Sequence, residues 1–164
     1  MQMKLEKLIL KRNYGAGLLY GVILFENPEY LEIMELRDFE FEGYQVIAKH
    51  AIAERMIVSR ADFYRKVIEK ENKYKKYLNP IKFETLEDLI KQIVEAEKYI
   101  ILEKRAGSFY LGPIVEIDSK FVKIQTISTQ GRNDTIEKIK LDSIFSVVWR
   151  NKYLNRFEKY ANKL

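Results

Sequence analysis

Few side chains in this sequence could perform chemistry. His50 is the only histidine and there is no cysteine, so neither a cysteine nucleophile nor a Cys/His metal site can form. A lone histidine could act as a general base, but it would need a nucleophile or co-ligands. We interpret His50 as a residue at a strand end, and we predict no catalytic and no metal-binding residue.

The carboxylates give no sign of acid–base catalysis. Glu26, Glu29, Glu32 and Glu35 follow one another every third residue, which would line a helix, but the surrounding apolar residues favour strand and turn. None of them stands among apolar residues in a way that would raise its pKa, as a catalytic acid requires. Metal binding by carboxylate oxygens alone has no supporting EF-hand spacing.

Motifs for phosphates and for activated serines are missing. The sequence has no Gly-x-Gly-x-x-Gly, no P-loop and no Gly-x-Ser-x-Gly, the glycine patterns that position phosphates or a nucleophile. Gly15-Ala16-Gly17 is not followed by a helical pattern and reads as a hairpin loop. We therefore expect no cofactor, and a protein that is not an enzyme.

Two oppositely charged segments are the candidate binding surfaces. The acidic segment, residues 26–42, is a candidate protein-binding surface. The basic segment, residues 60–76, combines lysines and arginines that neutralise phosphates with tyrosines that can stack on bases. The candidate protein-binding residues are Glu32, Glu35, Asp38, Glu40 and Glu42. The candidate nucleic-acid or anion-binding residues are Arg60, Arg65, Lys66, Lys70, Lys73, Lys76, Arg132, Lys138 and Lys140. The alternative, that both segments are solvated faces, stays open.

Composition is that of an ordinary globular protein. Of 164 residues, 47% are apolar and 32% are charged, and the net charge is +5. The residues at the N-terminus lack the apolar core of a signal peptide, and no stretch is apolar enough to span a membrane. Since a cysteine-free chain suits a reducing compartment, we expect a cytoplasmic protein without a membrane partner.

An internal repeat is the strongest pattern in the sequence. A block of glycine, a turn residue and apolar positions recurs 91 residues later, and a short upstream block recurs at an offset of 93. The first block is Gly21, Ile23, Asn27, Tyr30, Leu31 and Ile33, which matches Gly112, Ile114, Asp118, Phe121, Val122 and Ile124. The upstream block is Leu8-Ile9 with Lys11-Arg12, which matches Ile101-Leu102 with Lys104-Arg105. Such self-similarity indicates one structural unit present twice.

Each unit is predicted to contain five short strands followed by a helix. The predicted strands are residues 4–12, 18–26, 30–36, 43–49 and 55–59, then 99–104, 109–117, 121–127, 136–141 and 145–149. Helices are predicted from Ser59 or Asp62 to about Leu78, from the capping residue Thr85, and from the cap Asn151 to about Lys163. Residues 38–42 are expected to form a polar connection.

Five short antiparallel strands curl into a small barrel, and a mid-strand glycine is typical of a barrel corner. The predicted fold class is therefore α+β, mainly β, with two tandem SH3-like or Sm-like barrels. The predicted organisation is a first barrel with its helix at residues 1–78, a linker helix at 79–98, and a second barrel with its helix at 99–164.

The run at residues 112–122, Gly-x-Ile-x-x-Ile-Asp-x-x-Phe-Val, resembles the first signature block of Sm-like proteins, and residues 21–31 resemble it less closely. The resemblance implies a bent five-stranded barrel and, in many members, RNA binding through loops. Val122 and Leu31 stand where a base-contacting Asn is expected, and the Arg-Gly loop of the second block is missing. The helix also follows the strands here, whereas Sm-like barrels usually carry it before them. The resemblance therefore concerns the fold more than an RNA site.

These observations predict a non-enzymatic interaction protein, such as an adaptor, an inhibitor or an immunity-type binder, present as a monomer or homodimer. A protein partner would bind the acidic segment or an exposed barrel edge. The alternative is a protein of Sm-like type that binds RNA or single-stranded nucleic acid through the basic residues named above.

Overall fold

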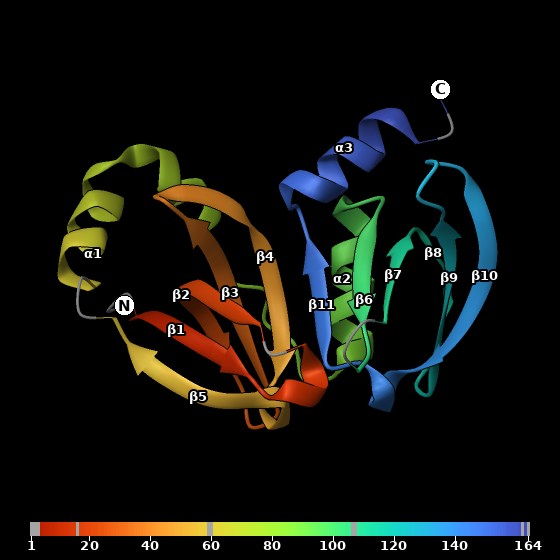
Figure 1. Cartoon of the computed structure of the whole chain (residues 1–164), viewed down its shortest axis with the longest axis horizontal. Coiled ribbons are helices and arrows are strands. Elements are labelled where there is room, and N and C mark those ends of the chain that lie inside the picture. Colours follow the sequence, from red (N-terminus) through yellow and green to blue (C-terminus); the bar gives the residue numbers. More distant parts are fainter. Residues whose placement is uncertain (1–3, 16, 59–60, 106–107, 162, 164) are drawn as a thin grey trace.

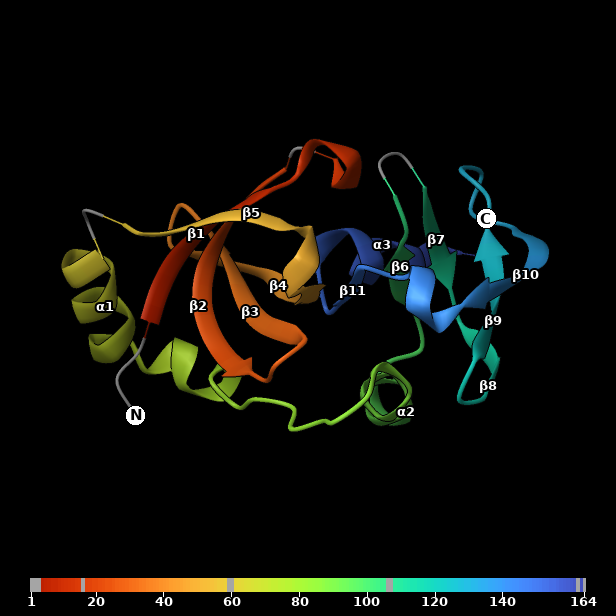
Figure 2. The same ribbon diagram turned by 90° about the horizontal axis from the view of Figure 1, so that it is seen from below.

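The computed structural model describes residues 4–15, 17–58, 61–105, 108–161 and 163. In this part of the chain the fold is mainly β, and strands outnumber the three α-helices (Figures 1 and 2). The predicted class, α+β and mainly β, is confirmed at this level. The side chains of Ala61, Asn72 and Lys73 are outside the description.

Strands of the first half lie side by side in the order β5-β1-β2-β3-β4. They are β1 (Lys4–Leu10), β2 (Leu18–Glu26), β3 (Tyr30–Arg37), β4 (Glu40–Ala48) and β5 (Ile52–Ile57). Most strand boundaries in this half differ from the prediction: β1 ends at Leu10, β3 ends at Arg37, and β4 and β5 cover 40–48 and 52–57 instead of 43–49 and 55–59. Asp38 and Phe39, with positive φ values of 47° and 63°, make a tight turn, so the expected polar connection is shorter and β4 starts at Glu40.

Strands of the second half follow the order β11-β6-β7, then β8-β9-β10. They are β6 (Ile100–Glu103), β7 (Phe109–Gly112), β8 (Ile114–Ile117), β9 (Phe121–Ile127), β10 (Asn133–Lys140) and β11 (Ser146–Trp149). The segment predicted as a strand at 109–117 is divided into β7 and β8 at Pro113, next to Gly112. β7 pairs with β6 and β8 pairs with β9, so one bent segment connects the two sheets.

The sheets do not divide into two separate five-stranded barrels. An eight-stranded sheet runs through both halves, because β4 pairs antiparallel with β11. Val46 lies opposite Val147, and Tyr44 lies opposite Trp149. Among the described residues no ladder closes either half on itself. A buried apolar cluster with residues from both halves, including Val46, Leu102 and Val147, makes this junction part of the core.

The hairpin β2–β3 has the same register as the hairpin β8–β9, 91 residues later, and both carry a bulge at the same place. The matched pairs are Ile23–Ile33 with Ile114–Ile124, Phe25–Glu32 with Glu116–Lys123, and Glu26–Leu31 with Ile117–Val122. The upstream offset of 93 is wrong by one residue: Leu8 pairs with Leu19, and Leu102 pairs with Tyr110, so β1 and β6 correspond at 94. Because a slip of one residue exchanges the two faces of a strand, this correction changes which side chains are equivalent.

Both hairpins contain a glycine in close contact with the neighbouring strand and a turn held by an Asn or Asp side chain. A Cβ on Gly21 would overlap the carbonyl oxygen of Met34, and a Cβ on Gly112 would overlap that of Gln125. In the turns, Asn27 Oδ1 accepts the backbone N–H of Tyr30 at 2.7 Å. Asp118 Oδ1 does the same with Phe121 at 2.8 Å, in the manner of an Asx-turn.

The helices are α1 (Ala61–Lys70), α2 (Leu86–Ala96) and α3 (Lys152–Tyr160). Thr85 caps α2 and Asn151 caps α3 by accepting backbone N–H groups of Asp88 and Leu154, as predicted. The single helix expected up to about Leu78 is wrong: α1 ends at Lys70 and a 3₁₀ helix, Asn72–Tyr77, follows.

The 3₁₀ geometry brings residues three apart onto one side. Tyr74 and Tyr77 thereby both meet the first sheet: the hydroxyl of Tyr74 donates to the carbonyl of Phe39, and the ring of Tyr77 stacks on Phe41 at 4.1 Å.

Candidate functional site

The basic residues predicted to bind nucleic acid do not form one surface. α1 lies at one end of the molecule, and β10, which carries Lys138 and Lys140, lies at the other end (Figures 1 and 2). Arg132 belongs to the loop before β10. Arg60 and the side chain of Lys73 fall outside the described residues.

Around α1, exposed lysines and an exposed aromatic ring share a helix face. Lys66 and Lys70 are exposed, and Phe63 is 60% exposed. The spacing i, i+3, i+7 places the three on one side of the helix. Arg65 is bound to Asp62 at 3.0 Å, so its charge is already compensated.

Tyrosines of the basic segment are used inside the protein. Tyr64 stacks on Phe39 with ring centroids 3.9 Å apart, and Tyr74 is buried. Tyr77 stacks on Phe41, and Lys76 Nζ lies 4.8 Å from the Tyr77 ring centroid. These rings are therefore not free to stack on bases, contrary to the interpretation based on the sequence.

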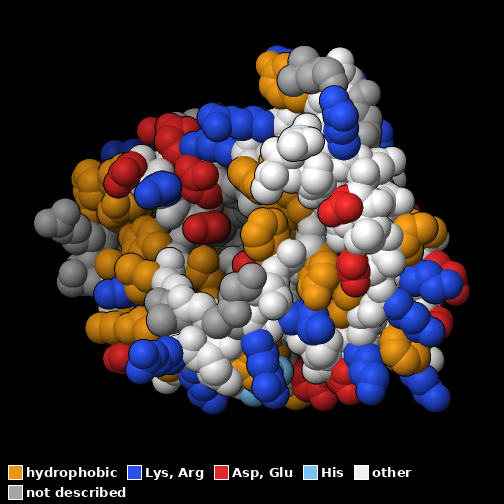
Figure 3. Space-filling view, turned by 45° about the vertical axis from the view of Figure 1, so that its right-hand side comes forward, with side chains coloured by type: hydrophobic (Ala, Val, Ile, Leu, Met, Phe, Trp, Pro, Cys, Tyr) orange, Lys and Arg blue, Asp and Glu red, His pale blue; other side chains and the backbone are white. Residues whose placement is uncertain are grey.

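The five acidic candidates are also dispersed. Glu32 is 0% exposed, so it presents no carboxylate on a surface. Asp38 and Glu40 are exposed at the β3–β4 turn. Glu42 is bound to Lys152 at 2.7 Å. On the face shown in Figure 3, red acidic and blue basic side chains lie side by side, and no single charge dominates.

Glu35 and Glu42 line the same cavity, of about 490 Å³, between the first sheet and the start of α3. Burial raises the pKa of Glu35, and the nearby Glu42 carboxylate raises it further. Arg37 and Lys152 also line this cavity, so each acidic group has a basic neighbour. The net charge of the cavity wall gives no preference for a cationic or an anionic ligand.

Glu32 is the most perturbed carboxyl group. Burial raises its pKa to about 8, against a smaller opposite effect of the hydrogen bond from the backbone N–H of Ile81. That bond reaches Oε2 at 3.0 Å, while Oε1 is buried without a partner among the described residues. The expectation that no carboxylate would have a raised pKa is therefore wrong for Glu32 and Glu35.

A second cavity, of about 230 Å³, adjoins Glu32 where the two halves meet. Tyr44 and Trp149 contribute aromatic side chains, while Glu97 and Arg150 contribute an ion pair. This wall holds the carboxyl groups of Glu32 and Glu97 but, among the described residues that line it, no serine, threonine, cysteine or histidine beside them, so we assign it no reaction. Trp149 is 3% exposed and belongs to the core.

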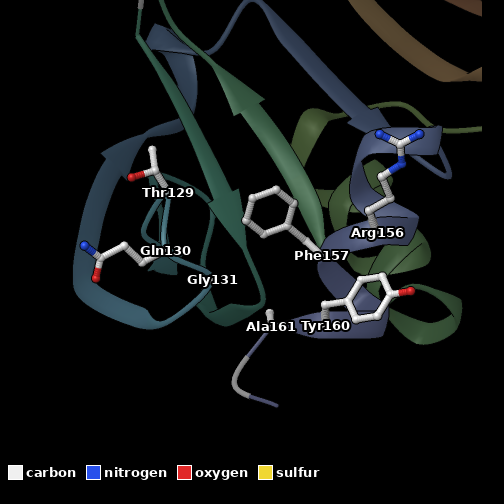
Figure 4. A pocket seen from close by; sticks show the side chains of 7 residues that line it. All are labelled: Thr129, Gln130, Gly131, Arg156, Phe157, Tyr160 and Ala161. Atoms are coloured by element: carbon white, nitrogen blue, oxygen red, sulfur yellow. The ribbon is translucent and has the colours of Figure 1, made fainter. Parts of the chain in front are cut away.

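A third cavity, of about 250 Å³, lies between α3 and the loop from Thr129 to Gly131 (Figure 4). Phe157 points toward that loop, whereas Arg156 and Tyr160 point away from it. The lining therefore has one aromatic ring, Phe157, that points into the cavity, and polar groups at its rim. None of the described lining residues places a buried charge there that could bind a ligand.

β5 and β7 lie at the ends of the eight-stranded sheet, and β8 and β10 lie at the ends of the three-stranded sheet. Of these four, β5 and β10 are not part of the bent segment that joins the two sheets. β5 pairs with β1 only, and β10 pairs with β9 only, among the described strands. An edge strand exposes a row of backbone N–H and C=O groups that can pair with another strand. Ile57 on β5 is 82% exposed and Ile136 on β10 is 57% exposed. These edges combine free backbone groups with apolar side chains, and they form the candidate interaction site.

His50 lies in the 3₁₀ turn Lys49–Ala51, where its ring contacts Tyr14 edge-on at 5.5 Å. Searching the described residues finds no group of His, Asp and Glu side chains arranged to hold a metal ion. Within the same residues, no helix has both the length and the apolar content to cross a membrane.

Comparison with protein-family models, curated proteins and solved structures finds no match to this chain. Its function must therefore be inferred from its own geometry and chemistry.

Proposed function

We propose that this is a non-enzymatic interaction protein that binds a partner by strand addition at the outer edges of β5 and β10. Each of its halves would be a copy of one small β-barrel unit of the SH3-like or Sm-like kind. The repeated registers and turns support the duplication. The cysteine-free composition supports the cytoplasm as its location.

One observation carries the proposal: two of the strands at sheet edges, β5 and β10, have exposed apolar side chains. Natural edges are usually covered, charged or very short. Ile57 and Ile136 are instead among the most exposed large apolar residues of the described chain. An added strand would satisfy the backbone groups and cover these side chains, which is how strand-addition partners gain both affinity and specificity.

Selection of short random peptides displayed on phage tests the proposal. Selected peptides are expected to bind the wild-type protein and to lose affinity for Ile57→Lys or Ile136→Lys. Phe63→Lys, which places the same charge on an exposed apolar residue of α1, should bind them normally. Hydrogen exchange should show slower exchange of amides in β5 or β10 when peptide is bound. Protection confined to helices or to the cavities would contradict strand addition.

A second function, binding of single-stranded nucleic acid, is favoured by the face of α1 that carries Phe63, Lys66 and Lys70. A ring flanked by lysines can stack on a base while the ammonium groups neutralise phosphates. Labelled RNA should then bind more weakly as salt rises, and both Phe63→Ala and the pair Lys66→Glu with Lys70→Glu should weaken binding. Unchanged binding in these variants would remove this candidate.

A further inference from the structure

We infer that the strand which occupies β10 is β5 of a second copy of this chain, in a ladder that repeats between molecules the β4–β11 ladder within one molecule. The inference rests on the proposed function, because it names the partner of the same two edges. A chain with one edge of each kind would then associate head to tail.

The starting point is that β10 corresponds to β4 and β11 corresponds to β5. In the hairpin β3–β4 Leu31 pairs with Ile47, and in the hairpin β9–β10 Val122 pairs with Ile139. The offset between Ile47 and Ile139 is 92 residues. β10 and β4 therefore present equivalent edges to a neighbouring strand.

The same offset relates β5 to β11. Arg55 pairs with Leu8, and Val147 pairs with Leu102, where Leu8 and Leu102 are the equivalent residues of β1 and β6. Both strands are preceded by a 3₁₀ turn at matching positions, Lys49–Ala51 and Leu141–Ser143. Each turn starts with a backbone hydrogen bond to the hairpin before it, from Lys49 N to Glu29 O and from Leu141 N to Lys120 O.

At the junction between the halves, β4 pairs with β11, which is the equivalent of β5. This pairing covers one edge of the kind that β4 presents and one edge of the kind that β5 presents. β10, with an edge of the first kind, and β5, with an edge of the second kind, are left over. Contacts between two different surfaces of like units are heterologous, and they continue from molecule to molecule into a ring or a filament.

Transfer of the observed register gives the pairs that a second copy would make. In the β4–β11 ladder Tyr44 lies opposite Trp149, Gln45 opposite Val148, Val46 opposite Val147 and Ile47 opposite Ser146. The equivalent pairs are Ile136 with Ile57, Glu137 with Met56, Lys138 with Arg55 and Ile139 with Glu54. The two exposed isoleucines come to lie opposite each other, at the position that the Tyr44–Trp149 pair occupies inside the molecule.

The exposure of the two isoleucines is an observation separate from the repeat. Nothing in the register transfer refers to exposure, yet it joins the 82% exposed Ile57 to the 57% exposed Ile136. Directly opposite apolar residues in an antiparallel ladder stabilise the pairing. Met56, which is also exposed, comes beside the aliphatic part of Glu137.

One pair in the transferred ladder is unfavourable. Lys138 faces Arg55, and like charges directly opposite destabilise a sheet. Arg55 is already bound to Glu6 at 2.7 Å and to Glu26 at 2.8 Å, so its charge is compensated within its own molecule. The repulsion from Lys138 is therefore weak, and replacement of this lysine by glutamine should change the association little.

Measurement of mass against protein concentration by sedimentation tests the inference. Wild-type protein should exceed the 19.6 kDa of one chain as its concentration rises. Ile57→Lys and Ile136→Lys should each weaken this self-association by at least about tenfold, whereas Tyr160→Lys, on an exposed ring of α3, should leave it unchanged. Lys138→Gln should change it little, because Arg55 is already paired with two carboxylates. Circular dichroism and thermal unfolding check that each variant is folded.

Mixing the two edge variants distinguishes head-to-tail pairing from other modes. Ile57→Lys keeps an intact β10, and Ile136→Lys keeps an intact β5, so an equal mixture should form a dimer although neither variant alone does. A dimer that joins two β10 edges or two β5 edges would instead survive in one single variant and gain nothing from mixing.

Wild-type protein that stays at the mass of one chain at all concentrations would overturn the inference, as would variants that associate as strongly as the wild type. The proposed function has a separate readout. Peptides that bind a monomeric protein at β5 or β10 would leave strand addition standing and exclude only the second copy as the partner.

Discussion

Tyr44 and Trp149 lie opposite each other in the β4–β11 ladder, and their rings stack with centroids 5.4 Å apart. Both side chains are buried. The Tyr44 hydroxyl also donates to the carbonyl oxygen of Tyr77 at 3.0 Å. This pair thus joins the two halves and the 3₁₀ helix that precedes the linker.

Replacement of Trp149 by alanine should destabilise the whole protein, because it removes a buried aromatic side chain and leaves a cavity at the junction. The expected loss is about 3–5 kcal/mol in the free energy of unfolding, measured by urea denaturation followed by circular dichroism. Tyr160→Ala, which truncates an exposed ring on α3, is the control and should cost much less. A small loss for Trp149→Ala would mean that the halves do not depend on this contact.

Gly21 and Gly112 should not tolerate a side chain. In each case a Cβ would overlap a carbonyl oxygen of the neighbouring strand, and backbone atoms cannot move away as a flexible side chain could. Gly21→Ala and Gly112→Ala are expected to cost on the order of 2–4 kcal/mol or to prevent folding, the range of severe steric changes.

Gly17→Ala is the matched control for both. Its Cβ would lie 3.5 Å from the side chain of Leu10, an ordinary contact, so thermal unfolding should change little. Equal melting temperatures for Gly17→Ala, Gly21→Ala and Gly112→Ala would contradict the close approach at the two hairpins.

Much of the strand pattern could be predicted from the sequence, because alternating side chains and turn residues act locally. Residues 18–26 and 121–127 have the predicted bounds. The N-caps Thr85 and Asn151 could likewise be predicted from the sequence, since an N-cap needs only a side-chain oxygen at the start of a helix.

The arrangement of the two halves could not be predicted from local sequence patterns. Pairing of β4 with β11 joins residues that are far apart in sequence, and no local pattern specifies which edges meet. The split of the basic helix after Lys70 depends on contacts of Tyr74 and Tyr77 with the first sheet, which the helical spacing alone does not contain.

The burial of Glu32 escapes sequence reasoning for a related reason. Its charge suggests an exposed acidic segment, whereas Leu31, Glu32 and Ile33 are all buried in β3. Both faces of this strand are covered, so alternation along it carries no information about exposure. The one available signal is that apolar residues stand on both sides of this glutamate.

The N-cap of α2 offers a measurable local contribution. Thr85 Oγ1 accepts the backbone N–H of Asp88 at 3.1 Å, a donor that the helix itself leaves unpaired. Thr85→Ala should lower the free energy of unfolding by about 1 kcal/mol, and Thr85→Ser should retain most of it. Identical urea midpoints for the alanine and serine variants would show that the cap contributes nothing.

The buried carboxyl of Glu32 should make stability depend on pH. Its pKa is raised from 4.5 to about 8, first because of burial. A folded-state pKa above the unfolded value means that the folded protein binds more protons between these values. The contribution of Glu32 to stability is therefore complete below about pH 4.5 and is lost as the pH rises through about 8.

Comparison of the wild type with Glu32→Gln isolates this effect, because the amide keeps the shape of the side chain and does not ionise. Unfolding measured in urea from pH 4 to pH 9 should show the variant gaining on the wild type as the pH rises, by about 5 kcal/mol at the upper end, with each pKa unit contributing about 1.4 kcal/mol. Glu35, whose pKa is also raised, remains in both proteins and cancels in the difference. Glu29→Gln, which makes the same replacement at an exposed position, is the matched control. A flat difference for Glu32→Gln would mean that the Glu32 carboxyl ionises in the folded protein as readily as in the unfolded chain.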